Sequence, residues 1–282
     1  MNSLKMRATQ PYFTSVKPAK ALQRYIDSYY FHTSDTINGQ VRFTYYPHIK
    51  HAVTIYKNSL AQVEGNLTVV HPDKAKGSVL YSTLRKRPHQ VELNGPFQKI
   101  GIVFKPYGIN RFVEKPVSLF NHSEISVFNE WDPALDRLKD EIWNTHTITE
   151  KTNLLDAFLK EQLKPETNEH FRQCIEEVLQ AEEAIATKAI LKNYYPNRKA
   201  LYRVFKQELN CSPRTFLKTL KFRKSLEQYL EANSMSLTQA AVAHFYDQSD
   251  FIKNVKQITH TTPKEFTRQV SDLDNAIFWN LE

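Results

Sequence analysis

The sequence predicts an α+β chain, with an N-terminal antiparallel β barrel or sandwich-like domain with helices and a C-terminal all-α domain of two repeated units. Three observations predict this fold class. All six glycines lie between Gly39 and Gly108, among short runs of β-forming residues. After Gly108 the apolar residues recur at helical spacing. In the C-terminal third, one segment recurs 50 residues further along the chain.

The N-terminal region contains six runs of β-forming residues, separated by turn signals such as Asn94-Gly95-Pro96. Runs of this length and spacing are typical of an antiparallel sandwich or a small open barrel. The expected strands are Arg42–Tyr46, Ala52–Lys57, Asn66–His71, Ser78–Leu84, Gln90–Leu93 and Gln98–Lys105.

Helix signals follow the β region. Asp132 and Pro133 predict an N-cap followed by a proline at the first helical position, and Thr147 and Glu150 have the spacing of a capping box. Residues 164–168 form the most linker-like break. We therefore expect a first domain over 1–165 that is β-rich to about residue 108, a second over 166–270, a tail over 271–282, and helices over 133–144, 148–162 and 169–181.

Two copies of one pattern, Asn197 to Phe216 and Asp247 to Phe266, make up most of the second domain. Each copy predicts an amphipathic helix, a short turn and a Ser-Pro or Thr-Pro pair that starts another helix. An alanine-containing helix before each copy completes a helix-turn-helix, because small residues let two helices cross closely. A long helix from Pro213 to about Ala232 is expected to separate the two units.

Positive charge is concentrated in the first copy and its surroundings. Residues 186–224 contain eleven Lys and Arg residues and one acid, Glu208, giving +10 against +8 for the whole chain. On a helix that begins near Asn197, the apolar side chains share one face. A solvated surface is one interpretation, but uncompensated charge on a single face favours a polyanion as the partner. The opposite, basic face carries Arg198, Lys199, Tyr202, Arg203 and Lys206.

The second copy has the same apolar face but little net charge. Phe251, Val255 and Ile258 fall on one side of its helix. Residues 225–270 contain four basic and five acidic side chains, so this unit is expected to add little affinity for phosphates. The side chains on its other face are Gln248, Ser249, Lys253 and Lys256.

These residues resemble the DNA-binding module of AraC/XylS-type transcription regulators. The resemblance rests on Leu201, Phe205 and Lys206 followed by Ser212-Pro213, and on the segment from Phe245 to Phe251 followed by Thr262-Pro263. It implies a double helix-turn-helix that places one helix of each unit in successive major grooves. In this reading Lys199, Tyr202 and Arg203 face bases in the first unit, and Gln248, Ser249 and Lys253 do so in the second.

The chain departs from the family pattern in its turns. His244-Phe245 replaces a Gly-Phe pair and shortens the second turn, and Asn210 and His260 replace glycines after the two recognition helices. Asn and His adopt left-handed conformations more readily than most residues, so these turns are expected to survive. The alternative function is an effector-binding or protein-interaction module whose second helix-turn-helix no longer reads DNA.

The β domain resembles, more loosely, the sensor half of these regulators, which is often a cupin-like barrel that binds a small molecule or dimerises. Candidate effector-binding residues are Tyr29, Tyr45, Tyr46 and His48, and the competing interpretation is that such aromatic residues build the core. The expected partners are double-stranded DNA and a small-molecule effector, with RNA polymerase and a second copy of the chain in a homodimer as further ones.

Enzymatic and membrane functions find no support in the sequence. It contains no nucleophile elbow, P-loop or dinucleotide fingerprint, and His48 and His51 would lie on different faces of a strand. We expect no catalytic residue, metal or cofactor; a metal-binding cupin enzyme with a nucleic-acid tether is the most distant alternative. Without a signal peptide or a long apolar run, the expectation is a cytoplasmic transcription regulator, activator or repressor, with no membrane partner.

Overall fold

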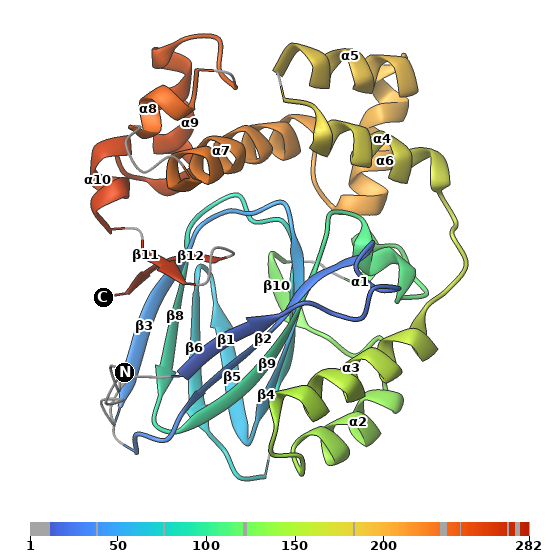
Figure 1. The fold of residues 1–282 in the computed structure, drawn as a ribbon, viewed down its shortest axis with the longest axis vertical. Coiled ribbons are helices and arrows are strands. Elements are labelled where there is room, and N and C mark those ends of the chain that lie inside the picture. The colour runs from blue at the N-terminus through green and yellow to red at the C-terminus, as the bar shows by residue number, and fades with distance from the viewer. Residues whose placement is uncertain are drawn as a thin grey trace, which may run out of the picture.

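The strands of the N-terminal region lie below a helical domain, and the long helix α7 (Pro213–Glu231) runs above them (Figure 1). The structure is a computed structural model that describes residues 12–37, 39–75, 77–120, 123–182, 184–231, 236–242, 244–269, 271–273 and 277–281. The arrangement of a strand-rich first part and a helical second part confirms the expected α+β class. Ala232, where the long helix was expected to end, lies outside the described residues.

The described strands form two six-stranded sheets, in the orders β1-β2-β9-β4-β7-β10 and β11-β12-β3-β8-β6-β5. Pairing is antiparallel except between β6 and β8. Strand β7, which lies between β6 and β8 in the sequence, belongs to the other sheet. The chain therefore crosses to that sheet and back, and β8 runs in the same direction as β6. The first sheet comprises β1 (Tyr12–Val16), β2 (Ile26–Ser34), β9 (Phe97–Phe104), β4 (His51–Lys57), β7 (Val79–Ser82) and β10 (Ile125–Val127); the second comprises β11 (Ser271–Leu273), β12 (Ile277–Leu281), β3 (Gln40–Tyr45), β8 (His89–Asn94), β6 (Leu67–Pro72) and β5 (Ser59–Glu64).

Each of the six expected runs contains a strand, whereas β1, β2, β5 and β10 were not expected. Five consecutive residues of β2, from Ser28 to His32, are buried, so the strand lacks the polar alternation that would have marked it. Its inner face packs with β4 and β9 against α2 (Ala134–Ile142) and α3 (Ile148–Gln162). These helices therefore cover the side of the first sheet that faces away from the second sheet.

The helical domain consists of two units joined by α7. The first unit packs around Phe171, Phe205 and Phe216, and the second packs around Phe222 and Phe251. Since Phe216 and Phe222 both belong to α7, this helix contributes to both cores. The other helices are α4 (Glu169–Gln180), α5 (Ala184–Tyr194), α6 (Arg198–Leu209), α8 (Leu237–Ala240), α9 (Gln248–Thr259) and α10 (Pro263–Gln269); η1 (Gly108–Arg111) and α1 (Val117–Phe120) precede them in the first domain.

The cap signals had different outcomes. The capping box of Thr147 and Glu150 is formed, and α3 begins at the next residue, Ile148, as expected. The expected N-cap at Asp132 is wrong, because Pro133 occupies the cap position and α2 begins at Ala134. The carboxylate of Asp132 therefore lies one residue too early to accept from the first turn.

The segment expected as a C-terminal tail carries two strands. β11 and β12 form a hairpin, and β12 pairs with β3 of the first domain through Trp279 opposite Tyr45 and Leu281 opposite Phe43. The end of this segment, Glu282, lies outside the described residues. Across the described part of the chain, no helix combines the length and apolar character needed to cross a membrane.

Candidate nucleic-acid interface

Helix α6 has well-defined ends that the local sequence explains. The side-chain oxygen of Asn197 accepts hydrogen bonds from the backbone N–H groups of Lys199 (2.8 Å) and Ala200 (3.3 Å). At the other end Asn210 adopts a left-handed conformation, with φ of 52°, and its N–H bonds to the carbonyl of Lys206. The expectation that Asn replaces the usual glycine here without loss of the turn is confirmed.

The two faces of α6 are separated as the sequence predicts. Phe205 and Leu209 are fully buried, and the Phe205 ring lies edge-to-face with those of Phe171 (5.2 Å) and Phe216 (5.6 Å). On the outer face Tyr202 is 52% exposed, which leaves its ring accessible to a base or sugar. Among the described residues, no carboxylate forms an ion pair with this face. Arg198, Lys199 and Arg203 are exposed and Lys206 is half-buried.

Glu208, the one acid of the basic window, does not neutralise it. Its side chain is buried, and its two oxygens accept from the amide nitrogens of Asn110 (2.8 Å) and Asn168 (3.1 Å). Burial raises the pKa of this carboxyl group. Because Asn110 belongs to the first domain, Glu208 connects the C-terminal end of α6 to that domain. This contact was not predicted; its one signal in the sequence is an isolated acid in a basic segment.

Helix α9 resembles α6 at both ends. The Asp247 carboxylate accepts from the N–H of Asp250 at 2.7 Å, and His260 ends the helix with φ of 62°. The predicted apolar face is buried. Helix α8, before α9, has only four helical residues, yet the Phe245 ring still packs edge-to-face on Phe251 at 5.3 Å. The four candidate contact residues Gln248, Ser249, Lys253 and Lys256 are all exposed.

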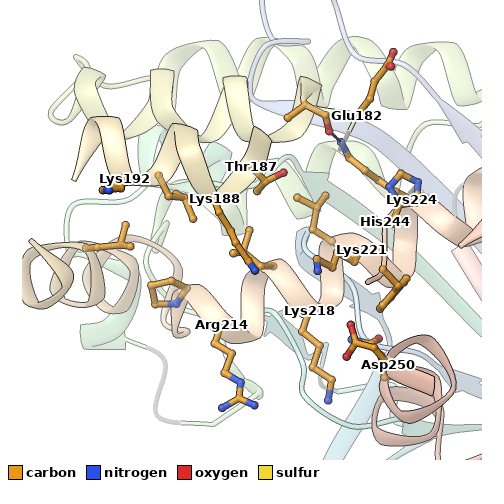
Figure 2. A pocket seen from close by; sticks show the side chains of 18 of the residues that line it. Glu182, Thr187, Lys188, Lys192, Arg214, Lys218, Lys221, Lys224, His244 and Asp250 are labelled. Atoms are coloured by element: carbon orange, nitrogen blue, oxygen red, sulfur yellow. Dashed lines mark hydrogen bonds between the residues drawn. The ribbon is translucent and has the colours of Figure 1, made fainter. Parts of the chain in front are cut away.

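An open cleft of about 700 Å³ lies between the two units (Figure 2). We call it the interunit cleft. It is bordered by α5, by α7, by the start of α6 at Arg198 and by α9 at Asp250, Lys253 and Gln257. Arg214 and Lys218 project from the same side of α7, and Lys188 reaches toward α7 from α5. The described basic residues that line the cleft are Lys188, Lys192, Arg198, Arg214, Lys218, Lys221, Lys224 and Lys253.

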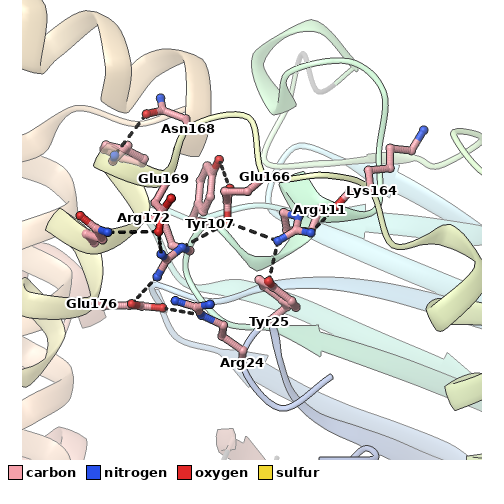
Figure 3. Close-up of polar contacts among 12 residues, drawn as sticks. Arg24, Tyr25, Tyr107, Arg111, Lys164, Glu166, Asn168, Glu169, Arg172 and Glu176 are labelled. Atoms are coloured by element: carbon pink, nitrogen blue, oxygen red, sulfur yellow. Dashed lines mark hydrogen bonds and ion pairs between the residues drawn. The ribbon is translucent and has the colours of Figure 1, made fainter. Parts of the chain in front are cut away.

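The expected linker is held by ion pairs at the junction of the domains (Figure 3). Glu166 pairs with Arg111 of the first domain at 3.3 Å and with Arg172 of α4 at 3.1 Å. Arg111 also donates through its Nε to the carbonyl oxygen of Lys164 at 2.7 Å. The junction therefore contains specific contacts in addition to the peptide connection.

A small cavity of about 100 Å³ lies among residues of both sheets. At roughly 30 Å³ per molecule this is the space of about three waters. Tyr45, Tyr46 and His48 line it, as expected for candidate effector-binding residues. Tyr29 does not, because neighbouring residues of a strand point to opposite faces and its neighbour Tyr30 faces the cavity. The Tyr29 hydroxyl instead donates to Asp156 at 2.9 Å.

Two guanidinium groups and the ammonium group of Lys50 give the cavity its charge. Arg85 lies 4.8 Å from the centre of the Tyr45 ring, and its Nε has no hydrogen-bond partner among the described atoms. Arg223 of α7 donates to the carbonyl oxygens of Pro47 (2.7 Å) and Tyr46 (2.8 Å), and burial lowers its pKa to about 9. Burial also lowers the pKa of His48 well below its usual value. No carboxylate is among the described lining residues, so the cavity favours a hydrogen-bond acceptor or an anion.

The described residues contain no group of three or more His, Cys, Asp and Glu side chains placed to hold a metal ion. His51 is close to the Tyr81 hydroxyl, at 2.5 Å, and burial lowers the pKa of this imidazole to about 4. Arg85 and Arg223 were not predicted as cavity residues, because nothing in the sequence near either one indicates that they line the same cavity.

Comparison with protein-family models defines the class of the C-terminal region. A model described as "Helix-turn-helix domain" matches residues 196–269, and one described as "Domain of unknown function (DUF6597)" matches residues 14–126. The chain therefore contains a helix-turn-helix domain, which supports a DNA-binding transcription regulator. More narrowly, this domain is of the AraC type, and it contains both α6 and α9.

Solved structures of ToxT from Vibrio cholerae show a distant likeness over most of the chain. One, with an unsaturated fatty acid bound, is 13% identical, covers 84% of this chain and 94% of its own, and has a TM-score of 0.44. A second ToxT structure, at 1.65 Å resolution, is 11% identical, with 92% and 98% coverage and a TM-score of 0.39. No curated protein matches the chain.

Proposed function

We propose that the chain is a sequence-specific transcription regulator that places α6 and α9 in successive major grooves of DNA. The observation that carries this proposal is the exposed basic face of α6, held outward by a fully buried Phe205 and left without carboxylate partners among the described residues. A face of this kind attracts the phosphate backbone, and its exposed Tyr202 and Arg203 can reach base edges.

The outer residues of α6 divide by their distance from the helix start. Lys199, Tyr202 and Arg203 lie on the first two turns, from which a recognition helix contacts bases. Arg198 and Lys206 flank them and are assigned to phosphates, which position the helix without reading sequence. In α9, Gln248 and Ser249 at the helix start are assigned to bases with Lys253, and Lys256 is assigned to phosphate.

Selection of bound duplexes from a random pool tests this assignment. We expect two half-sites about 10 base pairs apart, centre to centre. Arg203→Ala should relax base preference in one half-site at a cost of about 1–3 kcal/mol, whereas Arg137→Ala, an exposed arginine of α2, should change nothing. Binding without any base preference would refute the proposal.

We also propose that residues 1–165 form a sensor domain, and that its cavity, which Arg223 of α7 also lines, accepts a small ligand with an acceptor or anionic group. The charge of Arg85 and Arg223 and the tyrosines Tyr30, Tyr45 and Tyr56 support this choice. Thermal unfolding of the full chain with small carboxylates should show stabilisation of about 2.7 kcal/mol at 100 times the dissociation constant. The matched amides and the Arg85→Met variant should show less.

A domain that only dimerises is the competing role for the N-terminal region. Absence of stabilisation by every carboxylate, together with a dimer in sedimentation experiments, would favour it. RNA polymerase is a further expected partner, which a pull-down in the presence of the selected DNA would test.

The alternative function, with a second unit that no longer reads DNA, is favoured by two observations. The helix before α9 is only four residues long, and Asp250 is exposed beside the candidate base-reading residues. Protection of one major groove instead of two in a footprint would support this alternative.

A further inference from the structure

The interunit cleft carries positive charge that the surrounding fold does not neutralise. Its described lining contains eight basic side chains and two acidic ones, Glu182 and Asp250. The hydrogen-bond and ring partners of its lysines are neutral: Lys218 donates to the side-chain oxygen of Gln257, Lys224 to the carbonyl oxygen of Ala181, and Lys221 lies over the Phe245 ring. These contacts orient the ammonium groups but leave their charge in place. Attraction by Asp250 on Lys221, and by Glu182 and Glu227 on Lys224, offsets only part of the positive charge.

Four cations follow one face of α7. Arg214, Lys218, Lys221 and Lys224 are spaced by four, three and three residues, so they are neighbours on the helix surface and repel one another. Burial lowers the pKa of Lys218, and the charge of Arg214 lowers it further. No carboxylate among the described residues forms an ion pair with any of the four. A cluster of cations with this mutual repulsion is suited to bind an anion.

The position of the cleft identifies that anion. Its border includes Arg198 at the start of α6 and Lys253 of α9, so it lies between the two helices assigned to major grooves. A duplex that reaches both helices must present the backbone of its intervening segment to α7. We propose that α7 is a third DNA-contacting element, and that Arg214 and Lys218 bind the phosphodiester backbone between the two half-sites.

This inference rests on the proposed function and deepens it. Contacts to phosphate read no base directly, so α7 adds affinity for all sequences alike. Because α7 is one continuous helix that contributes to both cores, the cleft and the two recognition helices keep a fixed separation. Half-sites at another spacing would place the intervening phosphates away from Arg214 and Lys218.

The first experiment measures salt dependence in the full chain with Arg214→Ala/Lys218→Ala. Loss of two phosphate contacts should lower the slope of log affinity against log salt by about 1.8, so the ratio of wild-type to variant affinity should change about 12-fold between 50 and 200 mM salt. The base preference found by selection should stay as in the wild type. The matched control is Arg137→Ala/Lys160→Ala, which removes one exposed arginine and one exposed lysine from α2 and α3.

A variant that retains both charges distinguishes the loss of phosphate contacts from a loss of folding. Arg214→Lys/Lys218→Arg should keep the wild-type slope, and circular dichroism should show the same helix content in all variants. An alanine variant with the slope of its matched control would overturn the inference. If Arg203→Ala still relaxed base preference in that case, the proposed function would stand without it.

Phosphate ethylation interference locates the contact. Ethylation between the two half-sites should weaken binding of the wild type, and should have little effect on the Arg214→Ala/Lys218→Ala variant. Interference confined to the half-sites would overturn the inference. So would a salt-slope change seen with single-stranded RNA or inorganic polyphosphate but not with duplex DNA.

Discussion

Helices α6 and α9 share length and ends but differ in charge and in what holds them. Both span 12 residues, begin at a side-chain N-cap and end at a non-glycine residue with positive φ. At equivalent positions of the repeat, Glu208 bonds to Asn110 of the first domain, whereas Ile258 packs within its own unit. The comparison shows that caps and an apolar face specify the unit, while the outer face and its attachments can vary independently.

The largest predicted effect is a loss of folding stability, and it concerns the buried face that the two helices share. Phe205→Ala and Phe251→Ala each remove a buried ring from the centre of a core, so each should lower the free energy of unfolding by about 3–5 kcal/mol. Denaturant unfolding of the full chain measures both losses. Tyr202→Ala on the exposed face is the control and should stay within about 0.5 kcal/mol of wild type. A small loss for Phe251→Ala alone would mean that α9 is packed less firmly than α6.

A second prediction concerns the charge by which the helices differ. Replacing Lys199, Arg203 and Lys206 together by Gln should lower the salt slope of DNA binding by about two to three. Replacing Lys253 and Lys256 should lower it by less than about one, because the exposed Asp250 repels phosphates beside them. Filter binding over a range of salt concentrations measures both slopes. If each substituted residue lowered the salt slope by the same amount in α6 and in α9, α9 would contact the DNA backbone as closely as α6.

Single substitutions should give a smaller difference in the same direction. Arg203→Ala should cost about 1–3 kcal/mol of affinity for the selected site, and Lys253→Ala should cost less. The change in base preference should fall mainly in the half-site read by α6. If Lys253→Ala relaxed base specificity more than Arg203→Ala, α9 would contact bases at least as fully as α6. The predicted weakness of the second unit would then be wrong.

The sequence predicts the helical domain well, because its signals are local. The cap at Asn197, the left-handed Asn210 and His260, and the buried face of α9 each depend on residues within a few positions of one another. A capping box likewise fixed the start of α3. Such features depend on the local sequence and not on contacts between distant parts of the chain.

The β domain and its cavity depend on distant contacts that no local pattern reveals. In β2, Tyr30 faces the cavity and Tyr29 faces the other side of the sheet. The sequence does not predict which side chains face which side, because five consecutive residues of this strand are buried, and apolar and polar residues do not alternate. Arg85 and Arg223 meet across the domain junction although they are far apart in the chain. The Glu208 contact with Asn110 has the same origin.

The smallest predicted effect tests the attachment that only α6 has. Burial raises the pKa of Glu208 above its usual 4.5, so folding favours the protonated carboxyl group. Its contribution to the free energy of unfolding therefore falls as the pH rises from about 4.5 through the raised pKa. Glu208→Gln should abolish this decline and lie within about 1 kcal/mol of wild type, because the unpartnered Asn110 oxygen can turn to accept from the new amide.

Urea unfolding at several pH values between 4 and 8 measures this effect. Glu161→Gln, at an exposed position of the first domain, is the control and should keep the wild-type pH profile. An unchanged pH profile in Glu208→Gln would show that folding does not shift the pKa of this carboxyl group.

The pairing of β12 with β3 has a mechanical consequence for the helical domain. This domain is attached to the first domain by the linker at residues 164–168, by the backbone hydrogen bonds of β12, and by the contacts of Glu208 with Asn110 and of Arg223 with Pro47 and Tyr46. These attachments lie at separate points, so they prevent a simple rotation about any one of them. Any reorientation of α6 and α9 relative to the first domain therefore requires several of these contacts to break together.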